Sequence, residues 1–230
     1  MKPQPVMCRP EAFQLFADQL NYLSETDALV RAAVAVSMHQ LGDVDLERLF
    51  DSLRSYADVV RSRVRTKRVE AVLAHLHQVL FEEAGFRGDQ QNYYDPRNSY
   101  LPEMLRRRLG IPISLTLIYK AVAERVGLHV EGVNAPGHFL ARVRDQSGPI
   151  LVDPFFRGQM LTPEEALERL AQTSGRDIPR DPRLLRSATH VQWLARMIAN
   201  LQAIFSANNQ YQDLAAMNEL QRLLSQTAGH

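Results

Sequence analysis

The residues best suited to chemistry are a histidine and an aspartate on two neighbouring segments. The segment 138–143 alternates between its two faces and begins with His138, and the segment 150–153 ends with Asp153. Alternation of this kind is typical of strands. The residues between them, at 145–148, favour a hairpin turn. We therefore expect the two segments to pair as antiparallel strands.

The register of that hairpin decides whether the two side chains meet. If Val143 faces Ile150, then Leu140 faces Asp153, and His138 is diagonal to Asp153 on the same face of the sheet. A slip of one residue would separate the pair. In such a pair the carboxylate orients the imidazole and favours its protonated form. The alternative is a partly buried histidine that is merely satisfied by a neighbour.

An enzyme built on this pair also needs a nucleophile or a metal. His75 and His77 lie two positions apart in a segment with helical spacing, so they do not share a face. The chain has one cysteine, Cys8, which excludes an internal disulfide and most cysteine-rich metal sites. We predict neither a metal site nor a cofactor.

The elements around the pair indicate an α+β fold, with a helical N-terminal part, a core with a small antiparallel sheet, and a C-terminal helical hairpin. Apolar spacing predicts helices in the first hundred residues, with Ser24 as the N-cap of the second and Gly42 at its end. Further elements are expected as a helix over 114–126, strands over 128–133, 138–143 and 150–153, a helix beginning at 162–165, and helices over 190–207 and 211–225.

We divide the chain into a helical region at 1–88, a core at 89–185 and a helical tail at 186–230. The core begins with a polar loop that ends near Ser99, and a loop of this length is often functional. Tyr93, Tyr94 and Asn98 are its candidates for lining a ligand pocket. Packing within the loop is the alternative explanation for the tyrosine pair.

Several motifs near His138 and Asp153 resemble the SirB-type branch of the transglutaminase-like superfamily. They are Asn98-Ser-Tyr-Leu-Pro-Glu, Gly110-Ile-Pro-Ile-Ser-Leu, Gly127-Leu, Gly132-Val-Asn-Ala-Pro-Gly-His-Phe-Leu-Ala-Arg and Val152-Asp-Pro-Phe. The resemblance is close over roughly 98–158. It implies a papain-like fold in which a helix N-terminus presents a cysteine to a histidine and an aspartate on neighbouring strands. His138 and Asp153 match that histidine and aspartate.

The helix after Gly110 matches the family's nucleophile helix but contains no cysteine. Ser114 is the nearest candidate nucleophile, and Pro112 is equally close to the expected position. A serine hydroxyl is a poorer nucleophile than a thiolate, and a serine at a helix start is often only a cap. Cys8 lies far ahead of the histidine, as in papain-type proteases, but Met7-Cys-Arg-Pro resembles none of their motifs. We interpret Cys8 as a bystander in a mobile chain end.

The tail, from Asn200 to Leu224, resembles the start of a tetratricopeptide-like region. One hairpin cannot form the concave groove of such repeats. We therefore expect the hairpin to pack on the core.

Composition narrows the choice of partners. The net charge is +1, and the densest basic stretch, at 61–68, is flanked by acidic residues and contains no aromatic residue to stack on bases. No apolar run approaches the ~20 residues that span a bilayer, and the first ten residues do not resemble a secretory signal. We expect a cytoplasmic protein whose partner is a protein or peptide, with no nucleic acid and no membrane; the sequence predicts no oligomeric state.

Three functional hypotheses follow. The favoured one is a binding or regulatory module that lacks thiol chemistry, with an intact His–Asp pair and Ser114 used as a cap. The second is a hydrolase or acyl transferase acting on an amide or ester, in which Ser114 attacks, His138 is the general base and Asp153 orients the histidine. The third is a structural helical protein, with His138 and Asp153 apart or exposed.

Overall fold

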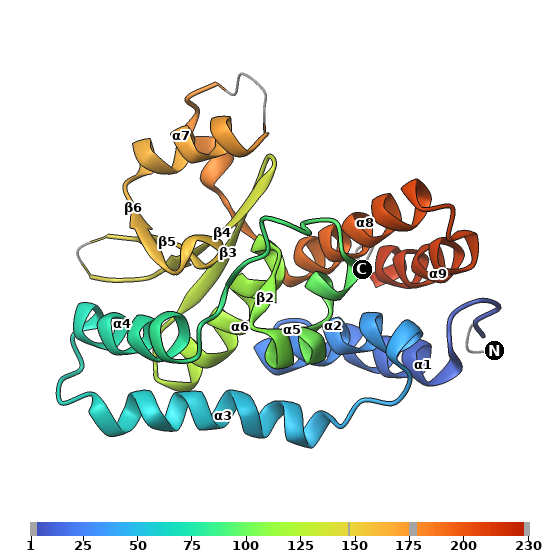
Figure 1. Ribbon diagram of the computed structural model, residues 1–230, viewed down its shortest axis with the longest axis horizontal. Helices are drawn as coiled ribbons and strands as arrows, with labels where there is room; N and C mark the ends of the chain where they lie inside the picture. Colours follow the sequence, from blue (N-terminus) through green and yellow to red (C-terminus); the bar gives the residue numbers. More distant parts are fainter. Residues whose placement is uncertain (1–3, 147, 175–178, 228–230) are drawn as a thin grey trace.

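The computed structural model describes residues 4–146, 148–174 and 179–227, and within them the fold is α+β (Figure 1). A five-stranded sheet has the order β6-β5-β4-β3-β7, with antiparallel neighbours throughout. Its strands are β3 Val130–Ala135, β4 His138–Val143, β5 Ile150–Asp153, β6 Gln159–Leu161 and β7 Ser187–Ala188. A separate parallel pair joins β1 Arg87–Gly88 to β2 Leu109–Gly110.

The hairpin has the register that would bring His138 and Asp153 together, and not the one-residue slip that the sequence left open. Val143 pairs with Ile150 across β4 and β5. In the turn between them Gly148 N donates to Asp145 O, whereas Ser147 lies outside the described residues. The other hairpin, β3–β4, turns tightly through Pro136 and Gly137, where Gly137 has φ +70°. A positive φ at the position after proline favours glycine, so this turn holds His138 at the first position of β4.

The helices begin and end close to the predicted positions. They are α1 Pro10–Gln19, α2 Thr26–Leu41, α3 Leu46–Arg63, α4 Val69–His77, α5 Leu101–Arg107, α6 Pro112–Arg125, α7 Pro163–Ser174, α8 His190–Ala207 and α9 Tyr211–Thr227.

Two helix starts illustrate how local chemistry sets these bounds. Thr162 and Glu165 form a reciprocal pair at the start of α7, since Glu165 N donates to Thr162 Oγ1 and Thr162 N donates to Glu165 Oε2. The prediction for Ser24 was wrong. The residue before α2 is Glu25, and it makes no side-chain capping bond. The helix is held instead by burial, because its alanines and valines form the centre of the main core.

The sheet separates two apolar clusters. On one face α6 packs with α2, α3 and α8 in the main core, and on the other face α7 covers a smaller cluster (Figure 1). Alternate residues of β4 belong to the two clusters: Phe139 faces the main core and Leu140 faces α7. This division fixes the direction in which each side chain of β4 points.

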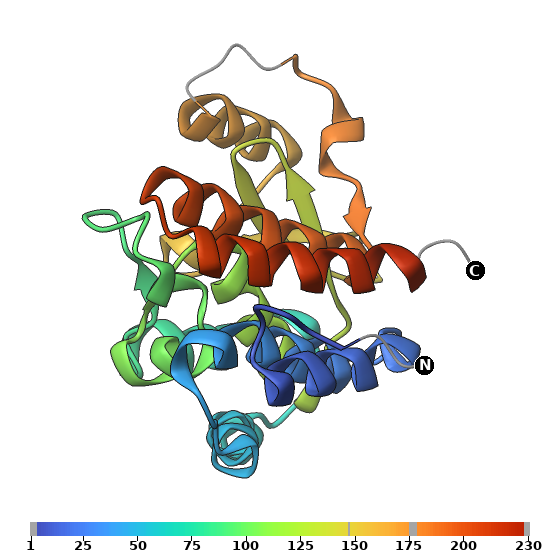
Figure 2. The same ribbon diagram turned by 90° about the vertical axis from the view of Figure 1, so that its right-hand side faces the viewer.

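The hairpin of α8 and α9 lies along α1 and α2 (Figure 2). Trp193 of α8 is fully buried, and its Nε1 donates to Ile113 O in the first turn of α6, 3.3 Å away. Glu219 of α9 accepts hydrogen bonds from the backbone N–H groups of Val6, Met7 and Cys8. The hairpin thus contributes to the core and also holds the N-terminal segment. In the described part of the chain no helix combines the length and apolar character that crossing a membrane requires.

Candidate functional site

The predicted His–Asp pair is present. His138 Nε2 lies 2.8 Å from Asp153 Oδ2, and the two residues are 2% and 0% exposed. Asp153 Oδ1 accepts backbone N–H groups from Phe155 and Phe156 at 3.1 and 3.4 Å, because the aspartate also caps the short 3-10 helix Pro154–Phe156. Each carboxylate oxygen is therefore engaged, and the imidazole is fixed by a rigid partner.

A third residue, Arg169 of α7, also contacts Asp153. Arg169 Nη1 lies 3.1 Å from Asp153 Oδ2, and its guanidinium stacks 4.1 Å from the centre of the Phe156 ring. His138 shares a face of the sheet with Leu140, which is the face that α7 covers. The pair is thus assembled between β4, β5 and α7. A cavity of about 530 Å3 lies beside it, lined in part by Phe155 and Phe156.

Ser114 is not joined to this pair by a hydrogen bond. It lies in the first turn of α6, two residues after Pro112, and is 0% exposed. Its Oγ has no hydrogen-bond partner among the described residues. It is also not the N-cap, a position that Ile111 occupies without a side-chain bond. The expectation that Ser114 caps its helix was therefore wrong, because Pro112 begins the helix two residues earlier.

Cys8 lies in the apolar core and not in a mobile end. It is 4% exposed, and burial, together with the nearby Glu219 carboxylate, raises the pKa of its thiol to about 12. The expected mobility was wrong, because Glu219 holds the segment through its backbone N–H groups. A thiol with so high a pKa is protonated at neutral pH and is a poor nucleophile.

The two tyrosines and the asparagine of the polar loop have different roles. Tyr93 and Tyr94 line an apolar groove of about 280 Å3 between the loop and α8, which Ile111 also lines. Asn98 is fully buried: its Nδ2 donates to Asn92 O at 2.7 Å and its Oδ1 accepts from an arginine of α5. Asn98 O also accepts from Ile111 N, so this asparagine positions the start of α6.

Comparison with known proteins identifies the family. Residues 47–199 match the transglutaminase-like superfamily. The chain belongs to this superfamily. The matched range is wider than the motifs around His138 and Asp153, and it extends from the start of α3 to the middle of α8.

Similar proteins include UPF0162 proteins of bacteria and an F-box protein of mammals. A UPF0162 protein from Xylella fastidiosa (strain Temecula1) is 38% identical over 197 residues, which cover 84% of this chain and 69% of that protein. A UPF0162 protein from Vibrio cholerae is 26% identical over 196 residues, covering 84% and 70%. The F-box only protein 21 of mouse is 38% identical over 102 residues, covering 41% of this chain and 16% of that protein. No solved structure gives a significant match.

Two arginines near the site, one from α7 and one from α8, were missed by sequence reasoning. Arg169 follows Asp153 by sixteen residues. Arg196 of α8 donates through Nη1 to Ala135 O at 2.5 Å and also to Asn134, at the turn that precedes His138. Both are single basic residues on amphipathic helices, so nothing in local spacing distinguishes them from surface arginines.

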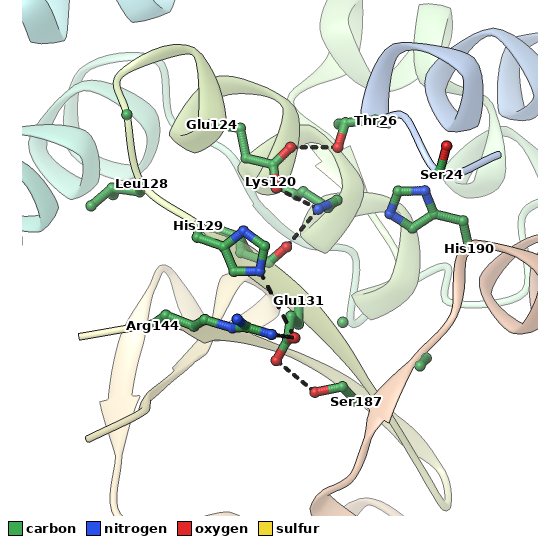
Figure 3. A pocket seen from close by; sticks show the side chains of 14 residues that line it. Ser24, Thr26, Lys120, Glu124, Leu128, His129, Glu131, Arg144, Ser187 and His190 are labelled. Atoms are coloured by element: carbon green, nitrogen blue, oxygen red, sulfur yellow. Dashed lines mark hydrogen bonds and ion pairs between the residues drawn. The ribbon is translucent and has the colours of Figure 1, made fainter. Parts of the chain in front are cut away.

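A third cavity, which is polar and measures about 630 Å3, lies at the opposite end of β3 (Figure 3). Lys120 of α6 donates to Glu124 Oε1 and Val130 O, both at 2.5 Å, and Arg144 contacts Glu131 at 2.5 Å. Thr26 extends this network by donating to Glu124. The lysine and the arginine that line this cavity thus have carboxylate partners from its own wall, and we interpret the network as a link between α2, α6 and the sheet.

Proposed function

We propose that this protein is a non-catalytic binding or regulatory module built on a transglutaminase-like core, with a protein or peptide as its partner. The observation that carries this proposal is the absence of a hydrogen bond between Ser114, at the nucleophile position, and the His–Asp pair among the described residues. Ser114 Oγ is buried without a hydrogen-bond partner among the described residues, and His138 is held by Asp153 on the face of the sheet covered by α7. A serine that neither makes a hydrogen bond to the base nor reaches solvent is not activated for attack.

The cysteine supports the same proposal. Papain-like chemistry needs a thiolate at the start of the helix that faces the histidine. The first turn of α6 contains Pro112, Ile113 and Ser114, and Cys8 is enclosed in the core with a pKa of about 12. Under this proposal His138 and Asp153 shape and stabilise the binding site instead of transferring protons.

The same proposal also covers the extent of the binding site, the family branch, the domain ranges and the role of the tail. The binding site would include His138, Asp153 and the tyrosine-lined groove, with Asn98 holding the loop from behind. The protein would represent the SirB-type branch, with helical, core and tail ranges at 1–88, 89–185 and 186–230. The tail would be a single tetratricopeptide-like hairpin whose role is packing, which the burial of Trp193 supports.

Covalent labelling tests the absence of chemistry. The folded protein is incubated with a fluorescent serine-directed phosphonate, alongside Ser114→Ala and His138→Gln. We expect no labelling that depends on Ser114, and we expect Ser114→Ala to unfold at nearly the wild-type denaturant concentration. Stoichiometric labelling that disappears in both variants would instead establish the alternative hydrolase or acyl transferase with a Ser114–His138–Asp153 triad.

A further inference from the structure

The groove beside the polar loop has an apolar floor with space above it. The floor is one face of α8, and its residues repeat at helical spacing: Asn200, Ala203, Ile204, Ala207 and Asn208. Both alanines are exposed, so no large side chain of α8 fills the groove. In Figure 2 the loop lies beside one end of α8 and α9, which is the end that forms this floor.

The opposite wall is aromatic. Tyr94 is 77% exposed and contacts Tyr93 edge to face, with ring centres 5.3 Å apart. Tyr93 in turn contacts Phe155, and Phe155 contacts His138, each with ring centres 6.0 Å apart. A continuous aromatic path thus joins the groove to the His–Asp pair.

Arg196 is a cation that has no carboxylate partner among the described residues and precedes the groove-lining residues of α8. Arg196 is one helical turn before Asn200 on the same face of α8. Arg196 makes no ion pair with a described residue; its Nη1 donates only to the turn that precedes His138. Burial lowers the pKa of Arg196 from its ordinary value. A half-buried guanidinium held by one nitrogen retains donors for a bidentate anion such as a carboxylate.

We propose that this groove binds the C-terminal end of an apolar peptide from a partner protein, whose terminal carboxylate pairs with Arg196. The inference rests on the proposed binding function and specifies its ligand. Charge complementarity selects the carboxylate, and the β3–β4 turn against which Arg196 lies favours a chain end over a continuing chain. The distance along α8 from Arg196 to Asn208 is about 18 Å at 1.5 Å per residue, which accommodates roughly five extended residues.

The amide side chains at the floor fit the same ligand. The side-chain amide of Asn200 makes no hydrogen bond with a described residue, and that of Asn208 makes only a 3.5 Å contact with a neighbouring glutamine. They are therefore available to bond the backbone of an extended peptide, which supplies one donor and one acceptor per residue. The tyrosine wall and alanine floor would then contact its apolar side chains.

An array of hexapeptides tests this directly. Each randomised sequence is printed twice, once with a free C-terminal carboxylate and once as the amide, and is probed with the fluorescently labelled full chain. We expect apolar sequences with a free carboxylate to bind roughly tenfold more strongly than their amides. Arg196→Gln should reduce that ratio to about one, and Arg196→Lys should keep part of it. Ala203→Trp, which fills the groove, should abolish binding of both forms.

The control is Arg183→Gln, because Arg183 is an exposed arginine paired with Asp181 and should leave the ratio unchanged. The proposal would be overturned if the two peptide forms bound equally, if Arg196→Gln left the ratio unchanged, or if no peptide bound at all. It would also be overturned if amidated peptides with an internal glutamate bound as strongly as apolar peptides with a free carboxylate. Phosphonate labelling distinguishes the two proposals. Labelling that depends on Ser114 refutes the non-catalytic function alone, whereas an absent carboxylate preference without labelling refutes only the peptide groove.

Discussion

Asp153 lies between His138 and Arg169, which contact the same oxygen of its carboxylate at 2.8 and 3.1 Å. The two partners come from different elements, β4 and α7, so this one carboxylate ties the sheet to the helix that covers it. Its other oxygen caps the 3-10 helix that carries Phe155 and Phe156. An aspartate with this many partners has a structural role whether or not the site performs chemistry.

Replacing Asp153 should therefore destabilise the fold strongly. Asp153→Ala leaves a buried imidazole and a mostly buried guanidinium without their acceptor, and we expect a loss of about 3–5 kcal/mol in the free energy of unfolding. Urea unfolding followed by circular dichroism measures it. The matched control on α7 is Glu168→Ala, whose carboxylate contacts an exposed arginine, Arg180, and should have almost no effect. Equal midpoints for the two variants would contradict the structural role.

The local parts of this fold are predictable from the sequence. The alternation of 138–143 and 150–153 sufficed to predict the hairpin and to reduce its register to two alternatives, because both depend on neighbouring residues. The two-residue strand β7 was not predicted, since it has no periodicity of its own and exists only by pairing with β3. Helix α2 shows the same limit, because its start depends on burial and not on the Ser24 side chain.

The residues of the candidate site were likewise predictable only where local sequence places them together. His138 and Asp153 were found because one register places them together. Arg169 and Arg196 were missed because their positions depend on how α7 and α8 pack, which local spacing does not encode. The burial of Ser114 likewise follows from tertiary packing, with Trp193 of α8 bonded to the same turn of α6.

Acid should destabilise the protein partly through His77. Burial lowers the pKa of His77 to about 4, and its Nε2 lies 3.0 Å from Tyr119 Oη. The unfolded chain binds this proton near its ordinary pKa of 6.5, so the unfolded state holds more protons between pH 6.5 and 4. The free energy of unfolding should fall over that window, by about 3 kcal/mol at most from this residue, with no further loss from it below about pH 4.

Urea midpoints measured from pH 7.5 to 4 test this. His77→Gln should show a shallower decline than wild type over the same window. His129→Gln is the control, because the ring of His129 is 56% exposed. Parallel curves for wild type and His77→Gln would show that the histidine is not neutral in the folded state.

The thiol of Cys8 should be unreactive until its segment is released. With a pKa of about 12 instead of 9, its thiolate fraction at pH 8 is about 1,000-fold lower, so Ellman's reagent should react at a corresponding fraction of the rate seen in urea. Glu219→Ala removes the acceptor of three backbone N–H groups and a nearby negative charge, and should speed the reaction. Arg222→Ala, an exposed change on the same helix, should not. Rapid stoichiometric reaction of the native protein would contradict the buried position.

The contact between α8 and the sheet depends on a glycine. A Cβ added at Gly132 would lie 2.4 Å from the ring of Trp193 and 2.7 Å from that of Phe139, closer than side-chain atoms approach. Gly132→Ala should therefore force Trp193 to shift, weaken its bond to Ile113 O, and cost about 1–3 kcal/mol in the free energy of unfolding. Trp193 is the only tryptophan in the chain, so its fluorescence reports the shift directly.

Combining Gly132→Ala with Trp193→Leu should lower the free energy of unfolding by less than the sum of the two single changes, because the smaller side chain relieves the clash. Strict additivity would show that the ring does not rest on the glycine.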